Sequence, residues 1–164
     1  MAVRTLAPAS QRTCEHVTAL DVCDRPLPED PYSAKFSLQH CVAIALRDGA
    51  VTDASFTADA RARIAAEREK VELWLSPAID RAYPKNWGVE LSVEAADGRW
   101  LVALRHDAKG DPENPVTTSE LSAKAQSLLS EGGLGAGQIE ALIRAILDLA
   151  DDRPVRSLRL FERG

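Results

Sequence analysis

Two alternating segments joined by Asp97-Gly98 constrain the fold of this chain more than any other feature. Residues 89–95 alternate apolar and polar side chains, and residues 100–105 follow almost at once as a second segment rich in apolar side chains. Alternation with a period of two is typical of β-strands, and an Asp-Gly dipeptide between two strands favours a tight hairpin. The sequence therefore predicts an antiparallel pair of strands at this point.

A two-residue turn at this dipeptide would also fix how the two strands pair. It would place Val93 opposite Val102 on one face of the hairpin and Glu90 opposite Arg105 on the other. Apolar pairs and pairs of opposite charge both stabilise neighbouring strands. We therefore expect a hairpin with one apolar face and one polar face.

Other segments predict further strands and the fold class. Residues 16–22 contain β-compatible side chains, and residues 71–75 alternate before Pro77, so both segments are expected to be strands. Along the chain, a strand is followed by helices, then by strands, then by helices. This order predicts an α+β fold, an antiparallel sheet of about four strands with helices packed on it.

Several stretches have helical patterns. Ser33 is expected to cap a helix that runs to about residue 46. The apolar face of this helix repeats at three- and four-residue steps and comprises Leu38, Cys41, Val42, Ala45 and Leu46. Residues 59–70 are rich in good helix formers but poor in apolar side chains, so that helix should lie on the surface. Two further helices are predicted at residues 117–130, which open with a capping box, and 136–150.

Composition places the chain among globular proteins. Of its 164 residues, 45% are hydrophobic and 27% are charged, which argues against disorder. The net charge of -5 leaves no basic surplus to neutralise phosphates, so no nucleic-acid partner is expected. No apolar run approaches the ~20 residues that span a bilayer, and residues 1–10 lack the apolar centre of a signal peptide. We therefore expect no membrane partner and a cytosolic location.

The cysteines do not predict a metal site. Cys14, Cys23 and Cys41 form no CxxC pair, and their odd number favours reduced, structural thiols. Cys14 and His16 could be part of a metal site, but no second pair of ligands lies at zinc-finger spacing. The expectation is that no metal binds.

Two polar stretches could carry chemistry. Gln39 and His40 lie in the first turns of the first predicted helix, about 100° apart around its axis. Lys109 lies in the loop at 106–115, beside a glycine, where it could bind an anion. A structural interpretation stays open for each stretch: local hydrogen bonds for Gln39 and His40, and ordinary solvation for the loop. The chain contains no glycine-rich phosphate loop and no G-x-S-x-G elbow.

The same two stretches resemble the MmgE/PrpD family. They are AKFSLQHCVAIAL at residues 34–46, followed by Asp48-Gly49, and HDAKGDPENPVT at residues 106–117. Members of the family include 2-methylcitrate dehydratase, cis-aconitate decarboxylase and iminodisuccinate epimerase. The resemblance implies a larger helical domain and a smaller α+β domain, with the active site between them, usually in a homodimer and without a cofactor. This chain resembles only the smaller, C-terminal domain.

The resemblance also implies roles for the candidate residues. His40 occupies a position at which some members have Tyr and others His, facing the cleft from the small domain, so it is the expected catalytic residue. Gln39 and Lys109 are the expected substrate-binding residues. A histidine can donate a proton or a hydrogen bond near neutral pH, as proton abstraction beside a carboxylate requires. The catalytic residues of the helical domain have no counterpart here, so the domain is expected to be catalytically incomplete by itself.

Three hypotheses follow. The chain is an incomplete lyase or isomerase domain, one subunit of a split enzyme that acts on a polycarboxylate with a separate helical domain, or a binding module without catalysis. The expected organisation is an unstructured or extended end at residues 1–15, the domain at 16–151 and a tail at 152–164. Apolar side chains of the tail or the last helix are expected to mediate homo-oligomerisation.

Overall fold

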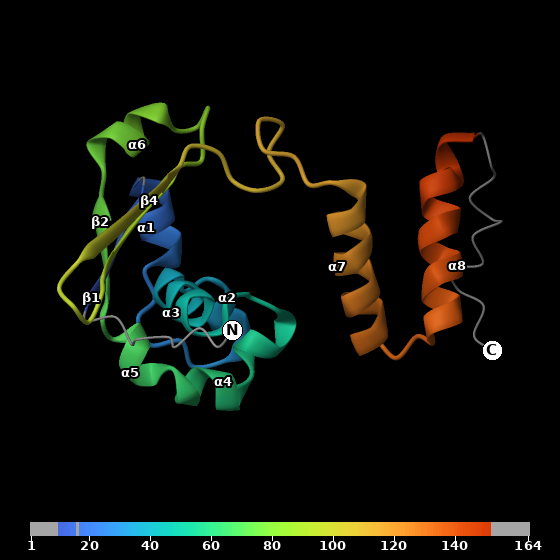
Figure 1. Cartoon of the computed structure of the whole chain (residues 1–164), viewed down its shortest axis with the longest axis horizontal. Coiled ribbons are helices and arrows are strands. Elements are labelled where there is room, and N and C mark those ends of the chain that lie inside the picture. The colour runs from blue at the N-terminus through green and yellow to red at the C-terminus, as the bar shows by residue number, and fades with distance from the viewer. Residues whose placement is uncertain (1–9, 16, 152–164) are drawn as a thin grey trace. The chain divides into compact units, whose positions relative to one another are not determined.

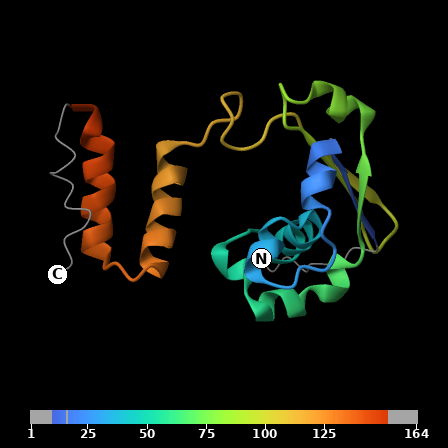
Figure 2. The same ribbon diagram turned by 180° about the vertical axis from the view of Figure 1, so that it is seen from behind.

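A computed structural model of the chain describes residues 10–15 and 17–151 (Figures 1 and 2). These residues form two compact units that divide between Ala108 and Lys109. The first unit contains the sheet and several short helices, and the second contains two longer helices. What was expected of residues 1–9, of His16 and of the tail at 152–164 lies outside the described residues.

The sheet of the first unit contains β1 (Ser10–Glu15), β2 (Val71–Leu75), β3 (Val89–Glu94) and β4 (Trp100–Arg105) in the order β2-β1-β3-β4. Its combination with helices confirms the α+β class. The expectation of a purely antiparallel sheet is wrong, because β1 pairs with β2 in parallel. The reason is the long helical connection between these two strands, which returns the chain to the end of the sheet where β1 begins.

The hairpin of β3 and β4 forms as expected, but its register differs by one residue. Ala95 N donates to Arg99 O at 2.8 Å, and Gly98 N donates to Ala95 O at 2.9 Å, so the loop has three residues instead of two. Gly98 takes the left-handed conformation, with φ of 82°, that such a loop requires. As a result Glu90 lies opposite Leu104, not Arg105. The hairpin therefore lacks the predicted apolar face and polar face, because polar residues of β3 lie opposite apolar residues of β4.

The first helix was not expected. Residues 17–23 form α1 (Val17–Cys23), where the sequence predicted a strand. Val17 N donates to the side chain of Asp80 at 3.1 Å, so a carboxylate 63 residues away satisfies a backbone donor of the first turn. Unpaired N–H groups in the first turn make a short helix costly to form. The sequence around α1 gives no sign of the partner, because Asp80 is distant along the chain.

The helix predicted between Ser33 and residue 46 is two helices. They are α2 (Pro31–Lys35), which Asp30 caps, and α3 (Leu38–Asp48), which Ser37 caps. Ser33 belongs to the capping box of α2, so its expected role as the cap of one long helix is wrong. α3 ends at Gly49 with φ of 78°, as the Asp-Gly dipeptide predicts.

The connection from α3 to the sheet contains η1 (Asp53–Phe56), α4 (Ala58–Arg63) and α5 (Ala65–Arg68), and α6 (Pro77–Ala82) follows β2. Figures 1 and 2 both show α2, α4 and α5 gathered around α3. The buried core comprises Ala43, Ile44, Ile64 and Val71, with Val42 and Leu73 packed against it. Residues 59–70 therefore contribute to the core through Ile64, which the sequence placed on the surface.

The second unit is a pair of helices, α7 (Thr118–Glu131) and α8 (Ala136–Leu147), followed by η2 (Asp148–Asp151). The capping box at the start of α7 is confirmed. Of the described residues of this unit, Ile139 is the buried hydrophobic one, at 3% exposure. None of the helices in the described ranges is long and apolar enough to cross a bilayer.

Candidate functional site

The start of α3, where the sequence placed the candidate site, lies inside the first unit. The hydroxyl of Ser37 accepts a hydrogen bond from His40 N at 3.0 Å, which fixes the first turn of the helix. Ser37 and His40 are both 0% exposed and Gln39 is 4% exposed. The buried side of α3 therefore consists of Gln39, His40, Ala43 and Ile44. The expected apolar face is rotated from this one, and its member Ala45 is exposed.

The imidazole of His40 is held by the segment that follows α3. Its Nε2 lies 2.9 Å from Ser55 O, and its ring lies 5.6 Å from the ring of Phe56. Because a carbonyl oxygen can only accept, Nε2 carries the hydrogen of this bond. Nδ1 is buried and has no hydrogen-bond partner among the described residues.

The charges of two arginines act on this histidine. Arg68 is 8% exposed, and its Nη1 donates to Arg61 O at 3.1 Å. Arg61 donates to Phe56 O at 2.7 Å and to Glu29 O at 3.1 Å. Burial lowers the pKa of His40 below its ordinary value, the charges of Arg68 and Arg61 lower it further, and the hydrogen bond to Ser55 opposes them. His40 is therefore neutral at neutral pH.

Sequence reasoning missed Arg68 and Ser55. Arg68 belongs to a segment that the sequence placed on the surface, and no role was predicted for Ser55, yet both are buried. A signal for Arg68 existed: Ala60, Ile64 and Arg68 follow one another at four-residue spacing, which puts them on one side of a helical turn. The 8% exposure of an arginine on that side could not be read from the pattern, because it depends on carbonyl partners supplied by other elements.

Gln39 serves a different contact from its neighbour His40. Its Nε2 donates to the Asp24 carboxylate at 2.5 Å, and its Oε1 accepts from Arg25 N at 3.2 Å. Both ends of the amide thus hold the segment that follows α1. A contact between Gln39 and a substrate stays a prediction, and it would compete with these two hydrogen bonds.

Lys109 lies at the start of the second unit and forms an ion pair there. Its Nζ lies 3.1 Å from Glu120 Oε2, and both side chains are half-exposed. Glu120 also accepts from Thr117 N at 2.7 Å and Thr117 Oγ1 at 2.9 Å. These bonds, the backbone one first, lower the pKa of Glu120 to about 2. The ammonium of Lys109 therefore already has an anionic partner, and its expected role toward a substrate stays a prediction.

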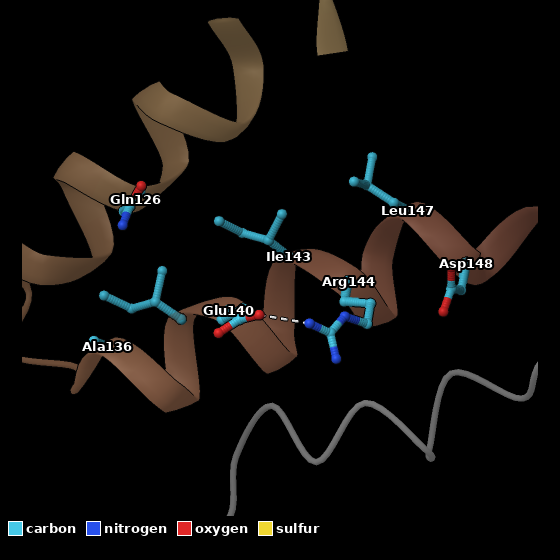
Figure 3. A pocket seen from close by; sticks show the side chains of 8 residues that line it. Gln126, Ala136, Glu140, Ile143, Arg144, Leu147 and Asp148 are labelled. Atoms are coloured by element: carbon cyan, nitrogen blue, oxygen red, sulfur yellow. Dashed lines mark hydrogen bonds and ion pairs between the residues drawn. The ribbon is translucent and has the colours of Figure 1, made fainter. Parts of the chain in front are cut away.

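Besides a cavity of about 380 Å³ lined by residues 25–30 and Ser33, the described residues line two more of a size that could accept a small molecule. One, of about 430 Å³, lies along α8, where Ile143 and Leu147 form its apolar wall and Glu140 pairs with Arg144 at its side (Figure 3). The other, of about 390 Å³, lies between α6 and the ends of β3 and β4. Its lining includes Ile79 and His106, the latter from the loop singled out in the sequence.

Metal-ligating residues do not converge in the described ranges. No three His, Cys, Asp or Glu side chains there are placed to share an ion. His16, the second residue of the Cys14 and His16 pair, lies outside the described residues.

Comparison with known proteins identifies one relationship. The family model described as the MmgE/PrpD C-terminal domain matches residues 12–149. This range includes most of β1, all of β2 to β4, α3 with His40, and both helices of the second unit. A search of curated proteins finds no match.

Proposed function

The chain belongs to the MmgE/PrpD family, and we propose that it is the small C-terminal domain of a lyase or isomerase that acts on polycarboxylates, in the manner of 2-methylcitrate dehydratase. The observation that carries this proposal is the match of residues 12–149 to the C-terminal domain of that family. It covers both stretches that carry the resemblance in sequence.

The domain alone is proposed to be catalytically incomplete. Abstraction of a proton beside a carboxylate needs a positioned base, and cations or hydrogen-bond donors for the developing enolate. His40 is neutral but enclosed, Gln39 is bonded to the segment at 24–25, and Lys109 is paired with Glu120. In this state His40 is closed off from solvent, and Gln39 and Lys109 already have partners, so activity would require a rearrangement and further residues from another polypeptide.

A separate helical domain is the proposed source of those residues, with His40 as the contribution of the small domain. The amphipathic α8 supports a helical partner, since Ile146 and Leu147 are about half-exposed, at 48% and 49%. Homo-oligomerisation through the same helix belongs to the proposal. So does a cytosolic location, which suits the thiol of Cys41, a cysteine outside any disulfide.

The alternative is a binding or assembly module that keeps the fold without the chemistry. The observation that favours it is the burial of His40, because a histidine with 0% exposure and a backbone partner behaves as a structural residue. Under this alternative, a mixture of the chain with a helical-domain protein of the family has no activity that depends on His40.

The test is a turnover assay on 2-methylcitrate, citrate and cis-aconitate. The full chain is assayed alone and with a helical-domain protein of the family, and His40→Asn is compared with His106→Asn, a substitution in the exposed loop. The proposal expects no turnover by the chain alone, turnover in the mixture, and its loss only in His40→Asn. A mixture that forms a complex but never turns over would support the binding module, provided that circular dichroism shows an intact fold.

A further inference from the structure

Two polar atoms in the interior of the first unit have no hydrogen-bond partner among the described residues. They are Nδ1 of His40 and Nε of Arg68. Their residues are 0% and 8% exposed. Buried polar atoms are nearly always hydrogen-bonded to protein or to ordered water, because an unpaired one costs the full penalty of its desolvation. Two such atoms in one core need an explanation.

The chemistry of the first atom follows from the other side of the ring. Nε2 donates to Ser55 O, so it carries the hydrogen of the neutral imidazole. Nδ1 therefore has a lone pair and no hydrogen, and it can only accept a hydrogen bond. Neither neighbouring hydroxyl donates to it: Ser37 Oγ, which accepts from His40 N, and Ser55 Oγ, which accepts from Thr52 N at 3.0 Å, form no hydrogen bond with Nδ1.

The second atom has the opposite character. A guanidinium never acts as an acceptor, so Nε of Arg68 can only donate. Arg68 lies at the end of α5, which packs directly against α3, and its charge contributes to the lowered pKa of His40. The core thus contains one unused donor and one unused acceptor on neighbouring helices, with no direct hydrogen bond between them.

We propose that one ordered water molecule binds between α3 and α5, accepting from Nε–H of Arg68 and donating to Nδ1 of His40. A group between these atoms must offer a lone pair to one and a hydrogen to the other, which water does. An anion would face the lone pair of Nδ1, and a metal cation would face the guanidinium. Buried waters typically bond two to four polar groups, and these two atoms supply the minimum.

The water gives His40 a defined role in the free chain. With Ser55 on one nitrogen and the water on the other, the ring is fixed as the Nε2–H tautomer and joins α3, η1 and α5. Two other basic side chains near this part of the core, Arg61 and Lys35 over the ring of Phe56, have partners of their own. Arg61 donates to Phe56 O and Glu29 O, and Lys35 pairs with Asp53 at 2.8 Å.

The first test uses the unmodified full chain. A high-resolution crystal structure is expected to show one density peak within hydrogen-bond distance of both His40 Nδ1 and Arg68 Nε. Nitrogen-15 NMR of histidine-labelled protein is expected to show Nδ1 of His40 unprotonated and hydrogen-bonded. A proton on Nδ1, a direct contact between the two side chains, or the lack of a peak would each overturn the proposal.

A pair of variants tests the same site in solution. Oxygen-17 relaxation dispersion counts long-lived internal waters, and Arg68→Met removes the donor while retaining an unbranched side chain. We expect one fewer long-lived water in Arg68→Met than in the parent. The count should not change in Arg63→Met, where the lost arginine forms an exposed ion pair with Asp48 at 2.8 Å. An unchanged count in a folded Arg68→Met would overturn the proposal, and if that variant does not fold, the measurements on the unmodified chain decide.

Discussion

The imidazole of His40 and the backbone carbonyl of Ser55 share a hydrogen bond of 2.9 Å in the interior of the first unit. The bond joins the first turn of α3 to η1, two elements whose caps are otherwise formed locally. His40 therefore has a structural role in the core, whatever its role in an active site. Substitutions at this residue must therefore be judged by their effect on folding before they are judged by activity.

Replacing His40 with alanine should destabilise the first unit. The change leaves a cavity in the core and the carbonyl of Ser55 without its donor, and we expect it to lower the free energy of unfolding by about 2–4 kcal/mol. All three tryptophans, Trp74, Trp87 and Trp100, lie in the first unit, so urea unfolding followed by tryptophan fluorescence reports on it. His106→Ala is the control, because its side chain is exposed. Equal stability of the two variants would contradict a structural role for His40.

The same burial predicts how stability depends on pH. In the folded chain the pKa of His40 lies below its ordinary value of 6.5, which the unfolded chain retains. Between the folded and the unfolded pKa, the unfolded chain therefore binds more protons than the folded one. The free energy of unfolding should therefore be highest above pH 6.5 and decrease as the pH falls below it. His40→Asn should flatten this decrease relative to the parent chain. The pKa values of the carboxyl groups of Asp30, Asp48 and Asp97 are also lowered in the folded chain, from 3.8. These groups affect stability in a separate pH range, below 3.8.

Gln39 is expected to control the segment that follows α1. Gln39→Leu keeps the bulk of the side chain but removes the acceptor of Arg25 N and the donor to Asp24, and it should cost about 1–3 kcal/mol. Amide hydrogen exchange at Arg25 should become faster. Gln126→Leu, on the exposed surface of α7, is the control and should leave that exchange unchanged. An unchanged Arg25 amide in Gln39→Leu would show that the two hydrogen bonds do not hold the segment.

The loop that sets the hairpin register gives a glycine test. Gly98 has φ of 82°, which a side chain disfavours, so Gly98→Ala should lower the free energy of unfolding of the first unit by about 1–2 kcal/mol. Gly137 lies within α8, where a Cβ would meet nothing within 4 Å. Gly137→Ala should therefore slow amide exchange in α8 and add about 0.5–1 kcal/mol. A neutral Gly98→Ala would argue against the three-residue loop.

Local signals in the sequence were sufficient for some parts of this fold. The strands of the hairpin, the capping box at Thr117 and the glycine that ends α3 depend on neighbouring residues, and each of these predictions is confirmed. The start of α1 could not be predicted, because its backbone donor is bound by Asp80. Pairing of β1 with β2 likewise depends on a connection of more than 50 residues.

The candidate site shows the same division. Gln39 and His40 were singled out because a helix entering a core seldom begins with polar side chains, and the resemblance added a role for His40. Their burial was not predicted, since it rests on Asp24, Arg25 and Ser55, none of them a neighbour in sequence. A pattern of apolar residues finds the buried side of a helix only when that side is apolar. On α3, half of it is polar and satisfied by distant groups.

Self-association through the second unit is the last prediction. Apolar side chains on α7 and α8 are about half-exposed, among them Leu121 at 54%, Leu128 at 50% and Leu147 at 49%. Amphipathic helices gain most of their stability from packing, so this surface should associate with another copy of the chain. Light scattering at high micromolar concentration is expected to give the mass of a dimer or larger.

The interface can be located with two variants. Leu147→Lys places a charge in the apolar wall of the α8 cavity and should shift the mass toward that of a monomer (Figure 3). Leu27→Lys, at a side chain of the first unit that is 71% exposed, should leave the mass unchanged. A monodisperse monomer of the parent chain would contradict self-association itself. A lysine without a partner is costly to bury in an interface. A dimer that survives Leu147→Lys but dissociates in Leu27→Lys would therefore place the interface on the first unit.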